Sequence, residues 1–291
     1  MASGLTNVSL NTGRVMPIIG FGTFQIVGKG LIYRVIDAAL ASGYRSFDTA
    51  AVYGNEEDIG QALKELLPKY GLTRDDIFLT SKLAPNDHGK NSAERAARKS
   101  LSHLGVTYLD MYLVHWPGVA GIPMESSHNL KLRTETWNAL SELYEKGILR
   151  GIGVSNYTVK HLEELFAHCK IKPAVNQVEF HPHFQQKELL KFCTTHGIHL
   201  QAYSSLGGSY NHSLVDDPVV TSIARKLGKG SAQVLLRWAV QQGVGVIPKS
   251  VTPNRIAENI KLNFSLSEED MTALGSIKKV EKYAWNPARV A

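Results

Sequence analysis

Along this chain, hydrophobic residues follow two spacings that alternate from one end to the other. Short runs rich in Val, Ile, Leu and Phe are typical of buried strands, and the longer segments between them repeat apolar residues every three or four positions, as amphipathic helices do. The predicted strands are residues 18–24, 46–48, 77–82, 109–115, 148–155, 175–179, 199–203 and 244–247. Because a helix that follows each strand returns the chain to the same end of the sheet, the pattern predicts parallel strands.

The helical spacing predicts eight segments that follow these strands. They are residues 31–42, 56–66, 92–104, 134–146, 158–168, 186–196, 218–227 and 253–261. Pro253 after Thr252 is typical of a helix start, and Gly105, Gly147 and Gly197 stand where helices are expected to end. Eight strand–helix units are the pattern of an α/β TIM barrel, (β/α)8, which is the fold class that we predict.

Two segments lie outside the eightfold pattern. Residues 8–10 and 15–17 flank a turn at 11–13 and predict a β-hairpin that plugs the N-terminal mouth of the barrel. Residues 231–242 have helical spacing and predict an additional helix before the last strand. Since no linker or change of composition interrupts the chain, we expect one domain over residues 1–291.

The main alternative architecture is a doubly wound open sheet, which commonly binds a dinucleotide through GxGxxG after its first strand. Here the first predicted strand ends in Gly20-Phe21-Gly22-Thr23-Phe24, which lacks that spacing. The sequence therefore favours the barrel, in which any dinucleotide must be held by other residues.

Composition and charge narrow the class of protein. Hydrophobic residues make up 43% of the 291 positions and charged residues 20%, which is typical of a globular chain. The chain has no signal-like N-terminal stretch and no apolar run of about 18 residues, and Cys169 and Cys193 have no metal-binding spacing. The net charge of +6 comes from dispersed Lys and Arg residues, which disfavours nucleic acid and suits a small polyanion. We expect a cytoplasmic protein without a membrane partner or a bound metal.

Polar residues at the ends of three predicted strands are the candidates for chemistry. Asp48, Lys82 and His115 end the second, third and fourth strands, and Tyr53 lies in the loop after Asp48. Active sites of such barrels are built at the carboxyl ends of the strands, so we expect these side chains to converge. Each residue alone also has a simpler explanation, such as a helix cap, a solvated lysine or a core histidine.

The four residue types together suit proton transfer. An Asp carboxylate compensates a Lys ammonium, whose charge can lower the pKa of a nearby phenol, and Tyr53 becomes a candidate acid. The imidazole of His115 can orient a carbonyl or assist the movement of the proton. The set contains no nucleophile with its own base, which disfavours acyl transfer.

Motifs over nearly the whole chain resemble those of aldo-keto reductases. The stretch Gly-Tyr-Arg-Ser-Phe-Asp-Thr-Ala at residues 43–50, followed by Tyr53-Gly54-Asn55-Glu56 and Ile59-Gly60, is similar to the signature of that family. Further matches lie at residues 20–23, 80–82, 110–117, 151–156, 176–177 and 247–250. The resemblance is to a member of the aldose reductase or diketogluconate reductase type with a short C-terminal tail.

The resemblance implies a catalytic tetrad of Asp48, Tyr53, Lys82 and His115, with Tyr53 as the general acid in reduction. It also implies NADPH or NADP+ as the cofactor, with the nicotinamide stacked on Tyr203. The implied cofactor contacts are Gly22, Thr23, Ser155, Asn156, Gln177, Tyr203, Ser204, Leu206, Lys249, Ser250, Val251, Thr252, Arg255, Glu258 and Asn259. Cations and hydroxyls near the start of the last predicted helix suit a ribose phosphate and favour NADPH over NADH.

Substrate choice is implied to rest on the loop at residues 116–133 and on the tail at residues 280–291. The tail is short, so we expect an open pocket in which Phe24, Trp116 and Trp285 contact the substrate. Small aldehydes, dicarbonyls or sugar-like carbonyls suit such a pocket. The family precedent also implies a monomer.

Two other classes of function remain open on the sequence alone. A binding or structural protein on the same scaffold, such as a channel accessory subunit or a crystallin, retains the NADPH site with little turnover, although an intact tetrad counts against it. A Schiff-base aldolase that uses Lys82 requires a lysine of lowered pKa, which the nearby Asp48 opposes. The sequence therefore favours an NADP-dependent aldehyde reductase.

Overall fold

The computed structural model describes residues 7–208 and 213–291 and contains one sheet of eight parallel strands. The strands are β3 (Phe21–Gly22), β4 (Ser46–Asp48), β5 (Phe78–Leu83), β6 (Met111–Val114), β7 (Ile152–Ser155), β8 (Val175–Glu179), β9 (His199–Tyr203) and β10 (Gly245–Val246). Each strand pairs with its neighbours in sequence, from β3 to β10. The two edges also meet, because Gly20 N donates to Val246 O and Val246 N donates to Ile18 O, both at 2.8 Å. The predicted (β/α)8 barrel is confirmed.

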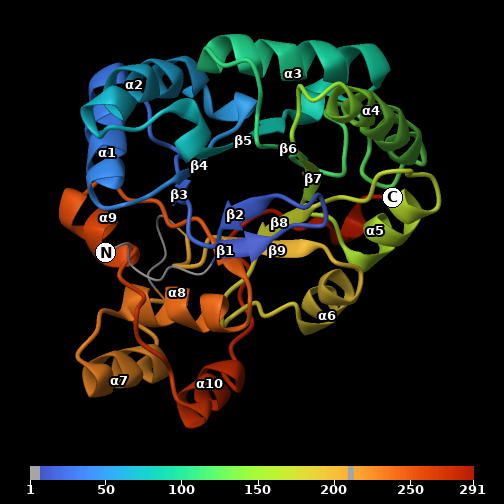
Figure 1. Ribbon diagram of the computed structural model, residues 1–291. Helices are drawn as coiled ribbons and strands as arrows, with labels where there is room; N and C mark the ends of the chain where they lie inside the picture. Colours follow the sequence, from blue (N-terminus) through green and yellow to red (C-terminus); the bar gives the residue numbers. More distant parts are fainter. Residues whose placement is uncertain (1–6, 209–212) are drawn as a thin grey trace.

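Helices surround this barrel, as Figure 1 shows. They are α1 (Lys29–Ala41), α2 (Glu56–Lys69), α3 (Lys90–Leu104), α4 (His128–Glu145), α5 (Val159–Phe166), α6 (Lys187–Thr195), α7 (Pro218–Leu227), α8 (Ser231–Gln241), α9 (Pro253–Asn259) and α10 (Glu268–Gly275). Their apolar faces supply buried residues such as Ile36, Leu66, Leu140 and Trp238 to one core shared with the strands. Two helices, α7 and α8, stand between β9 and β10, which confirms the additional helix.

The N-terminal hairpin closes one mouth of the barrel. It consists of β1 (Asn7–Ser9) and β2 (Val15–Pro17), which pair antiparallel in front of the strands in Figure 1. Met16 is fully buried in an apolar cluster with Phe78, Met111 and Val175. These three are the first residues of β5, β6 and β8. The hairpin therefore covers the amino-terminal ends of the strands and leaves the opposite mouth for the chemistry.

The helix boundaries differ most from the prediction where a helix buries polar side chains. Helix α4 begins at His128 rather than at residue 134, so the loop after β6 is shorter than predicted. The first turns of α4 bury Asn129 and Arg133, which hydrophobic spacing does not register. Helix α10 was not predicted at all, because its buried residues are only Asp270 and Leu274.

Two further local differences concern the predicted site. Tyr53 ends a 3-10 helix, Ala51–Tyr53, rather than lying in a loop. Strand β5 continues one residue beyond Lys82, since Leu83 still pairs with Val114 of β6. Within the described residues, none of the helices has the length and hydropathy needed to cross a bilayer.

Candidate active site

The carboxyl-terminal ends of β4, β5 and β6 bring the predicted tetrad together. Lys82 is fully buried, and its Nζ donates to Asp48 Oδ1 at 2.5 Å, to Thr49 O at 2.9 Å and to Tyr53 Oη at 3.3 Å. His115 directly follows β6, and its ring lies edge-on to the Tyr53 ring with the centroids 5.6 Å apart. The structure thus places all four residues in one cluster, as expected for residues at neighbouring strand ends.

The charge state of Lys82 depends on two opposing effects. Burial lowers the pKa of an ammonium group, whereas the adjacent Asp48 carboxylate and Tyr53 phenol raise it, and the net pKa of Lys82 is raised. Lys82 therefore stays protonated. This opposes the Schiff-base alternative, because a nucleophilic lysine must lose its proton.

The phenol of Tyr53 keeps its proton at neutral pH. Burial raises the pKa of Tyr53, and the charge of Lys82 lowers it by less, so the net shift is upward. This is opposite to the direction expected from Lys82 alone, because desolvation of the phenolate is the larger effect in the free protein. A group that retains its proton until the substrate arrives can serve as a general acid.

His115 is in the neutral form at the same pH. Burial and the charge of Lys82 lower the pKa of His115 to about 3. Its Nδ1 is buried without a hydrogen-bond partner in the described part of the chain, and Asn156 Nδ2 donates to its backbone oxygen at 3.0 Å. A neutral imidazole can hydrogen-bond a carbonyl but has no surplus proton to give, so the geometry favours Tyr53 as the acid.

The amide of Gln177 on β8 is oriented by its neighbours inside the barrel. Its Nε2 donates to Asp48 Oδ2 at 2.7 Å and to Gln201 Oε1 at 2.8 Å. A carboxylate only accepts hydrogen bonds, so the NH2 group of Gln177 must face Asp48. The Oε1 atom of Gln177 is thereby left available as an acceptor, which fits the predicted contact with a carboxamide.

Three other predicted nicotinamide contacts lie at the ends of β7 and β9. Tyr203 Oη donates to Asn156 Oδ1 at 2.6 Å, which fixes the half-buried tyrosine ring. Asn156 adopts a left-handed φ of 64° and donates from Nδ2 to Ser155 Oγ at 3.1 Å. Ser155 Oγ in turn donates to Gln177 O at 2.8 Å. Hydrogen bonds thus join these three residues to Gln177.

Gly22 and Thr23 lie beside the tetrad at the end of β3. A Cβ on Gly22 would stand 2.6 Å from Ile247 O, so only glycine fits there. Thr23 donates to Asp48 O from its backbone N at 3.1 Å and from Oγ1 at 2.8 Å. Both residues therefore border the Asp48 end of the site.

Two buried amides near the site did not appear among the predicted residues. Asn55 Nδ2 donates to Thr23 O at 3.0 Å and to Ile26 O at 2.9 Å, and its Oδ1 accepts from Thr49 Oγ1 at 2.6 Å. Gln201 orients Gln177 as described above. Gln201 is a polar residue within a predicted strand, and this could have indicated a role inside the barrel. The hydrogen-bond partners of Asn55 are known only from the folded structure.

The predicted contacts for the adenosine end gather around the start of α9. Lys249, Val251, Thr252, Arg255 and Glu258 are exposed, Ser250 is half-buried and Asn259 is buried. Neither Lys249 nor Arg255 forms an ion pair with any described residue. Helix α9 has only seven residues, so the positive charge near its start comes mainly from these two side chains.

Ser204 and Leu206, the remaining predicted contacts, follow β9. Ser204 has a left-handed φ of 51°, and its backbone oxygen accepts a hydrogen bond from Gly207 N at 2.8 Å. Leu206 is half-buried and packs against the core. The segment after Gly208 includes residues 209–212, which lie outside the described part of the chain.

The predicted substrate contacts are three aromatic residues, of which Phe24 contacts the tetrad through Tyr53. Phe24 is 53% exposed, and its ring centroid lies 5.1 Å from that of Tyr53. Trp116 follows His115 and meets Trp285 of the tail edge-on, with centroids 6.0 Å apart. Trp285 is 78% exposed.

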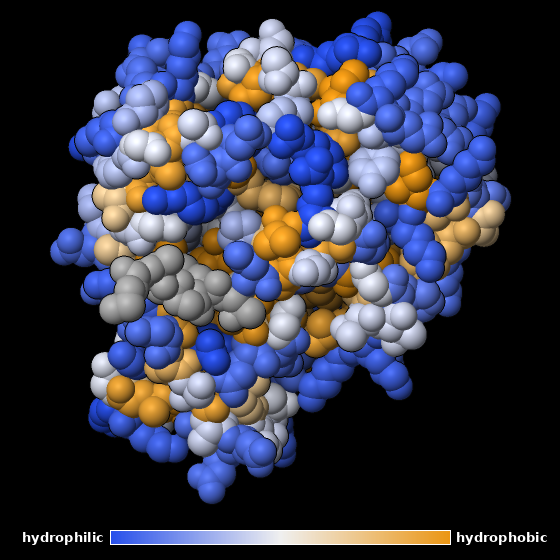
Figure 2. Space-filling model, in the orientation of Figure 1, coloured by the Kyte–Doolittle hydropathy of each residue, from blue (hydrophilic) through white to orange (hydrophobic). Residues whose placement is uncertain are grey.

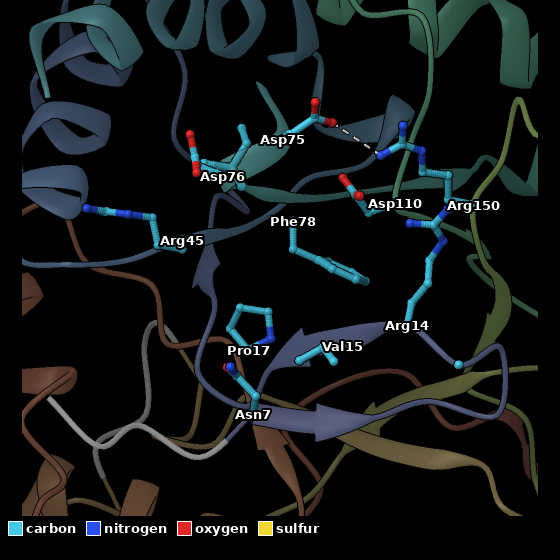
Figure 3. Close-up of a pocket in the computed structure, with 12 residues that line it drawn as sticks. Asn7, Arg14, Val15, Pro17, Arg45, Asp75, Asp76, Phe78, Asp110 and Arg150 are labelled. Atoms are coloured by element: carbon cyan, nitrogen blue, oxygen red, sulfur yellow. Dashed lines mark hydrogen bonds and ion pairs between the residues drawn. The ribbon is translucent and has the colours of Figure 1, made fainter. Parts of the chain in front are cut away.

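A separate hollow of about 510 Å³ lies at the opposite end of the barrel, beside the hairpin. Figure 3 shows the arginine and aspartate side chains that line it, and Arg150 points toward Asp75, 3.4 Å away. Asp110 pairs with Arg74 at 2.6 Å, so these charges compensate one another. In Figure 2, hydrophobic groups gather near the middle of this face within a largely hydrophilic rim. None of the predicted site residues lines this hollow.

Comparison with known proteins identifies the family. Residues 18–279 match the model of the "Aldo/keto reductase family". The chain is 44% identical to glyoxal reductase of Bacillus subtilis, over 96% of this chain and 95% of that protein. It is 41% identical to aldo-keto reductase family 1 member A1-A of Danio rerio, over 95% of this chain and 90% of that protein.

Solved structures agree with the sequence relatives. An aldo/keto reductase from Brucella melitensis superposes with a TM-score of 0.84 and 42% identity, over 93% of this chain and 98% of that one. An aldo-keto reductase from a Medee basin deep-sea metagenome library has a TM-score of 0.89 and 38% identity, over 98% and 99% of the two chains. Together with the barrel and the clustered tetrad, these matches show that the chain belongs to the aldo/keto reductase family of oxidoreductases.

Proposed function

We propose that this protein reduces small aldehydes and dicarbonyls to alcohols, with NADPH as the cofactor and Tyr53 as the proton donor. The observation that carries the proposal is the contact of the buried Lys82 ammonium with both Asp48 and Tyr53. It supports a protonated phenol held beside a fixed positive charge, at the end of the barrel where parallel strands position catalytic groups.

Each member of the tetrad has one part in this reaction. NADPH, when bound, supplies the hydride to the carbonyl carbon. Tyr53 donates its proton to the carbonyl oxygen, and the positive charge of Lys82 stabilises the phenolate that remains. Asp48 compensates the charge of the buried Lys82. His115, which is neutral, hydrogen-bonds the carbonyl oxygen and directs it toward Tyr53.

The chemistry of the surrounding side chains fits NADPH. Gln177, whose Oε1 is free to accept, would bind the carboxamide, and the Tyr203 ring would stack on the nicotinamide. The exposed cations Lys249 and Arg255 would bind the ribose phosphate that distinguishes NADPH from NADH. Two such cations without an ion pair among the described residues support the phosphorylated cofactor.

The open, aromatic mouth supports small carbonyl substrates. Phe24 and Trp285 are both largely exposed, which leaves the approach to Tyr53 uncovered on that side. The similarity to a glyoxal reductase supports a dicarbonyl substrate in particular. As further parts of the proposal, the protein acts as a cytoplasmic monomer of one domain, without a nucleic-acid or membrane partner.

The proposal is tested by following NADPH oxidation with glyoxal and a panel of aldehydes, in the native protein and in Tyr53→Phe. We expect kcat to fall by about 100- to 10,000-fold in the variant, the range for loss of a general acid. The affinity for NADPH, measured by fluorescence titration, should stay close to that of the native protein. A Tyr53→Phe variant that retains its turnover contradicts the role of Tyr53. Tight NADPH binding by a native protein that reduces no carbonyl favours the binding-protein alternative.

A further inference from the structure

A buried carboxylate at the end of β8 binds the C-terminal tail. Glu179 has no exposed side-chain surface. It accepts hydrogen bonds from His181 Nε2 at 3.0 Å, Lys282 Nζ at 2.5 Å, Tyr283 N at 2.5 Å and Ala284 N at 3.1 Å. Three of these four donors belong to the tail, more than a hundred residues further along the chain. The tail therefore supplies most of the hydrogen bonds to this carboxylate.

When the tail docks, the same residues that hold it also compensate the charge of Glu179. Burial raises the pKa of Glu179, but the hydrogen bonds from His181, Lys282 and Tyr283 N lower it by more, so the carboxylate is ionised. A buried carboxylate without donors is strongly unfavourable. Release of residues 282–284 would leave Glu179 with His181 as its one remaining partner among the described residues. This energetic cost holds the tail in place.

A second contact holds the same part of the tail from the side. His183 is buried, its Nδ1 lies 2.9 Å from Tyr283 Oη, and its Nε2 lies 3.0 Å from Asp217 Oδ2. The backbone oxygen of His183 accepts from Glu281 N at 3.0 Å. The chain after β8 therefore holds residues 281–284 by both backbone and side-chain bonds.

The residue that follows this segment is Trp285. Its ring meets Trp116 edge-on, and Trp116 follows His115, whose ring lies edge-on to that of Tyr53. Because Trp285 is 78% exposed, little of its own surface is buried to fix it. Its position therefore depends on the backbone on both sides, namely on residues 282–284, which Glu179 binds, and on the end of the tail, where Ala291 O accepts from Arg133 Nη1 at 2.6 Å.

We propose that Glu179 is a positioning residue for substrate choice, which fixes residues 282–284 and through them places Trp285 beside Trp116 at the mouth of the site. The inference rests on the proposed function, because it concerns carbonyl substrates that react at Tyr53. We expect an aromatic aldehyde that reacts at Tyr53 to place its ring against the tryptophan pair and to bind more tightly when Trp285 is held in place. We expect glyoxal, which has only two carbons, to make less contact with this pair than an aromatic aldehyde does.

The test compares Glu179→Gln with Glu125→Gln as a matched control. Glu125 also pairs with the tail, through Arg289 Nη2 at 2.5 Å, but both side chains are exposed. In Glu179→Gln we expect the KM for benzaldehyde to rise by about 2- to 10-fold, the range for loss of one aromatic contact. The KM for glyoxal and kcat for both substrates should not change. Glu125→Gln should match the native protein with both substrates.

Two further measurements separate positioning from a general structural defect. If Glu179 acts through Trp285, the double variant Glu179→Gln/Trp285→Ala should have the same KM for benzaldehyde as Trp285→Ala alone. Hydrogen exchange at residues 282–285 should be faster in Glu179→Gln than in Glu125→Gln. Lys282→Gln removes one of the donors to Glu179, so it should raise the KM for benzaldehyde and the rate of hydrogen exchange at residues 282–285 less than Glu179→Gln does. If Glu179→Gln does not fold, Lys282→Gln provides the test.

The outcomes distinguish this inference from the proposed function. A native protein that reduces neither aldehyde overturns the proposed function and the inference together. With an active native protein, equal losses for benzaldehyde and glyoxal, additive effects in the double variant, or unchanged exchange at residues 282–285 overturn the role of Glu179 alone.

Discussion

At the scale of single residues, Asp48 and Lys82 form an ion pair within the site that is almost completely buried. Lys82 has no exposed side-chain surface and Asp48 has 4%, so neither charge is solvated by water. Two buried charges stabilise a fold only through each other, and an apolar pair of similar volume is often as stable. The pair is therefore best explained by the chemistry that it supports at Tyr53.

We expect Lys82→Met to lower the free energy of unfolding by about 3–5 kcal/mol, because it leaves the buried Asp48 carboxylate without its cation. The double variant Asp48→Asn/Lys82→Met removes both charges and should recover most of that loss while remaining inactive. Urea unfolding monitored by circular dichroism measures both values. If the single and double variants are equally destabilised, the unpaired carboxylate is not the cause.

At the scale of elements, the hydrophobic pattern predicts which segments are helices and strands better than it predicts their ends. Strands β8 and β9 and helix α7 have the predicted bounds. The buried residues of α7, which are Val220, Ile223 and Ala224, are all apolar and recur at helical spacing, whereas the two strands also bury polar residues such as Gln177 and Gln201. Helix α4 starts earlier than predicted, because Arg133 and Asn129 are held in the interior by hydrogen bonds. Arg133, for example, donates to Pro117 O at 3.0 Å and to Glu164 Oε2 at 2.7 Å. Because these partners are distant in the sequence, the burial of Arg133 and Asn129 produces no hydrophobic spacing from which the start of the helix could be predicted.

The contact of α2 with the end of α3 depends on a glycine. A Cβ on Gly60 would stand 2.5 Å from Leu104 O and 2.8 Å from Leu104 Cα, both of which are backbone atoms. Gly60→Ala should therefore lower the free energy of unfolding by about 1–3 kcal/mol, as overpacking does.

Gly30→Ala, in the first turn of α1, is the matched control for Gly60→Ala. A Cβ there meets nothing within 4 Å, so this change should raise the free energy of unfolding by about 0.4–1 kcal/mol through the entropy of the unfolded chain. Urea denaturation of the two variants and the native protein measures these changes in the free energy of unfolding. Gly60→Ala with native stability would contradict the close packing of the two helices.

At the scale of the whole molecule, two neutral histidines, of which His88 is buried and His199 is half-buried, make stability depend on pH. Burial lowers the pKa of His88 to about 4, although its hydrogen bond to Trp116 O opposes the shift, and burial also lowers the pKa of His199 to about 4. Histidine in an unfolded chain has a pKa of about 6.5. Between about pH 6.5 and pH 4 the unfolded state therefore binds more protons than the folded state, and stability falls as the pH falls.

We expect the free energy of unfolding to decrease through this window, by up to about 1.4 kcal/mol per pH unit for each such histidine. His199→Gln removes one of them and should flatten the slope between pH 6.5 and pH 4. The difference between native protein and variant at each pH cancels the contribution of the carboxylates. Parallel slopes would show that His199 is protonated equally in both states.

The sequence by itself determined the class of fold and identified four residues that cluster at the strand ends. The alternation of strand and helix patterns is local, and Asp48, Lys82 and His115 lie at or directly after the ends of apolar strands, where a parallel barrel gathers them. The motifs carried the resemblance to the family that the comparisons then showed.

The tertiary structure alone decided which charges are buried and which distant segments meet. The upward shift of the Tyr53 pKa depends on how much burial outweighs the charge of Lys82, which no spacing reveals. The orientation of Gln177 depends on Asp48 and Gln201, and the contact of Glu179 with the tail joins residues more than a hundred positions apart. Hydrogen bonds and desolvation act over a few ångströms in space, whatever the separation along the chain, so only the folded barrel brings these groups within range.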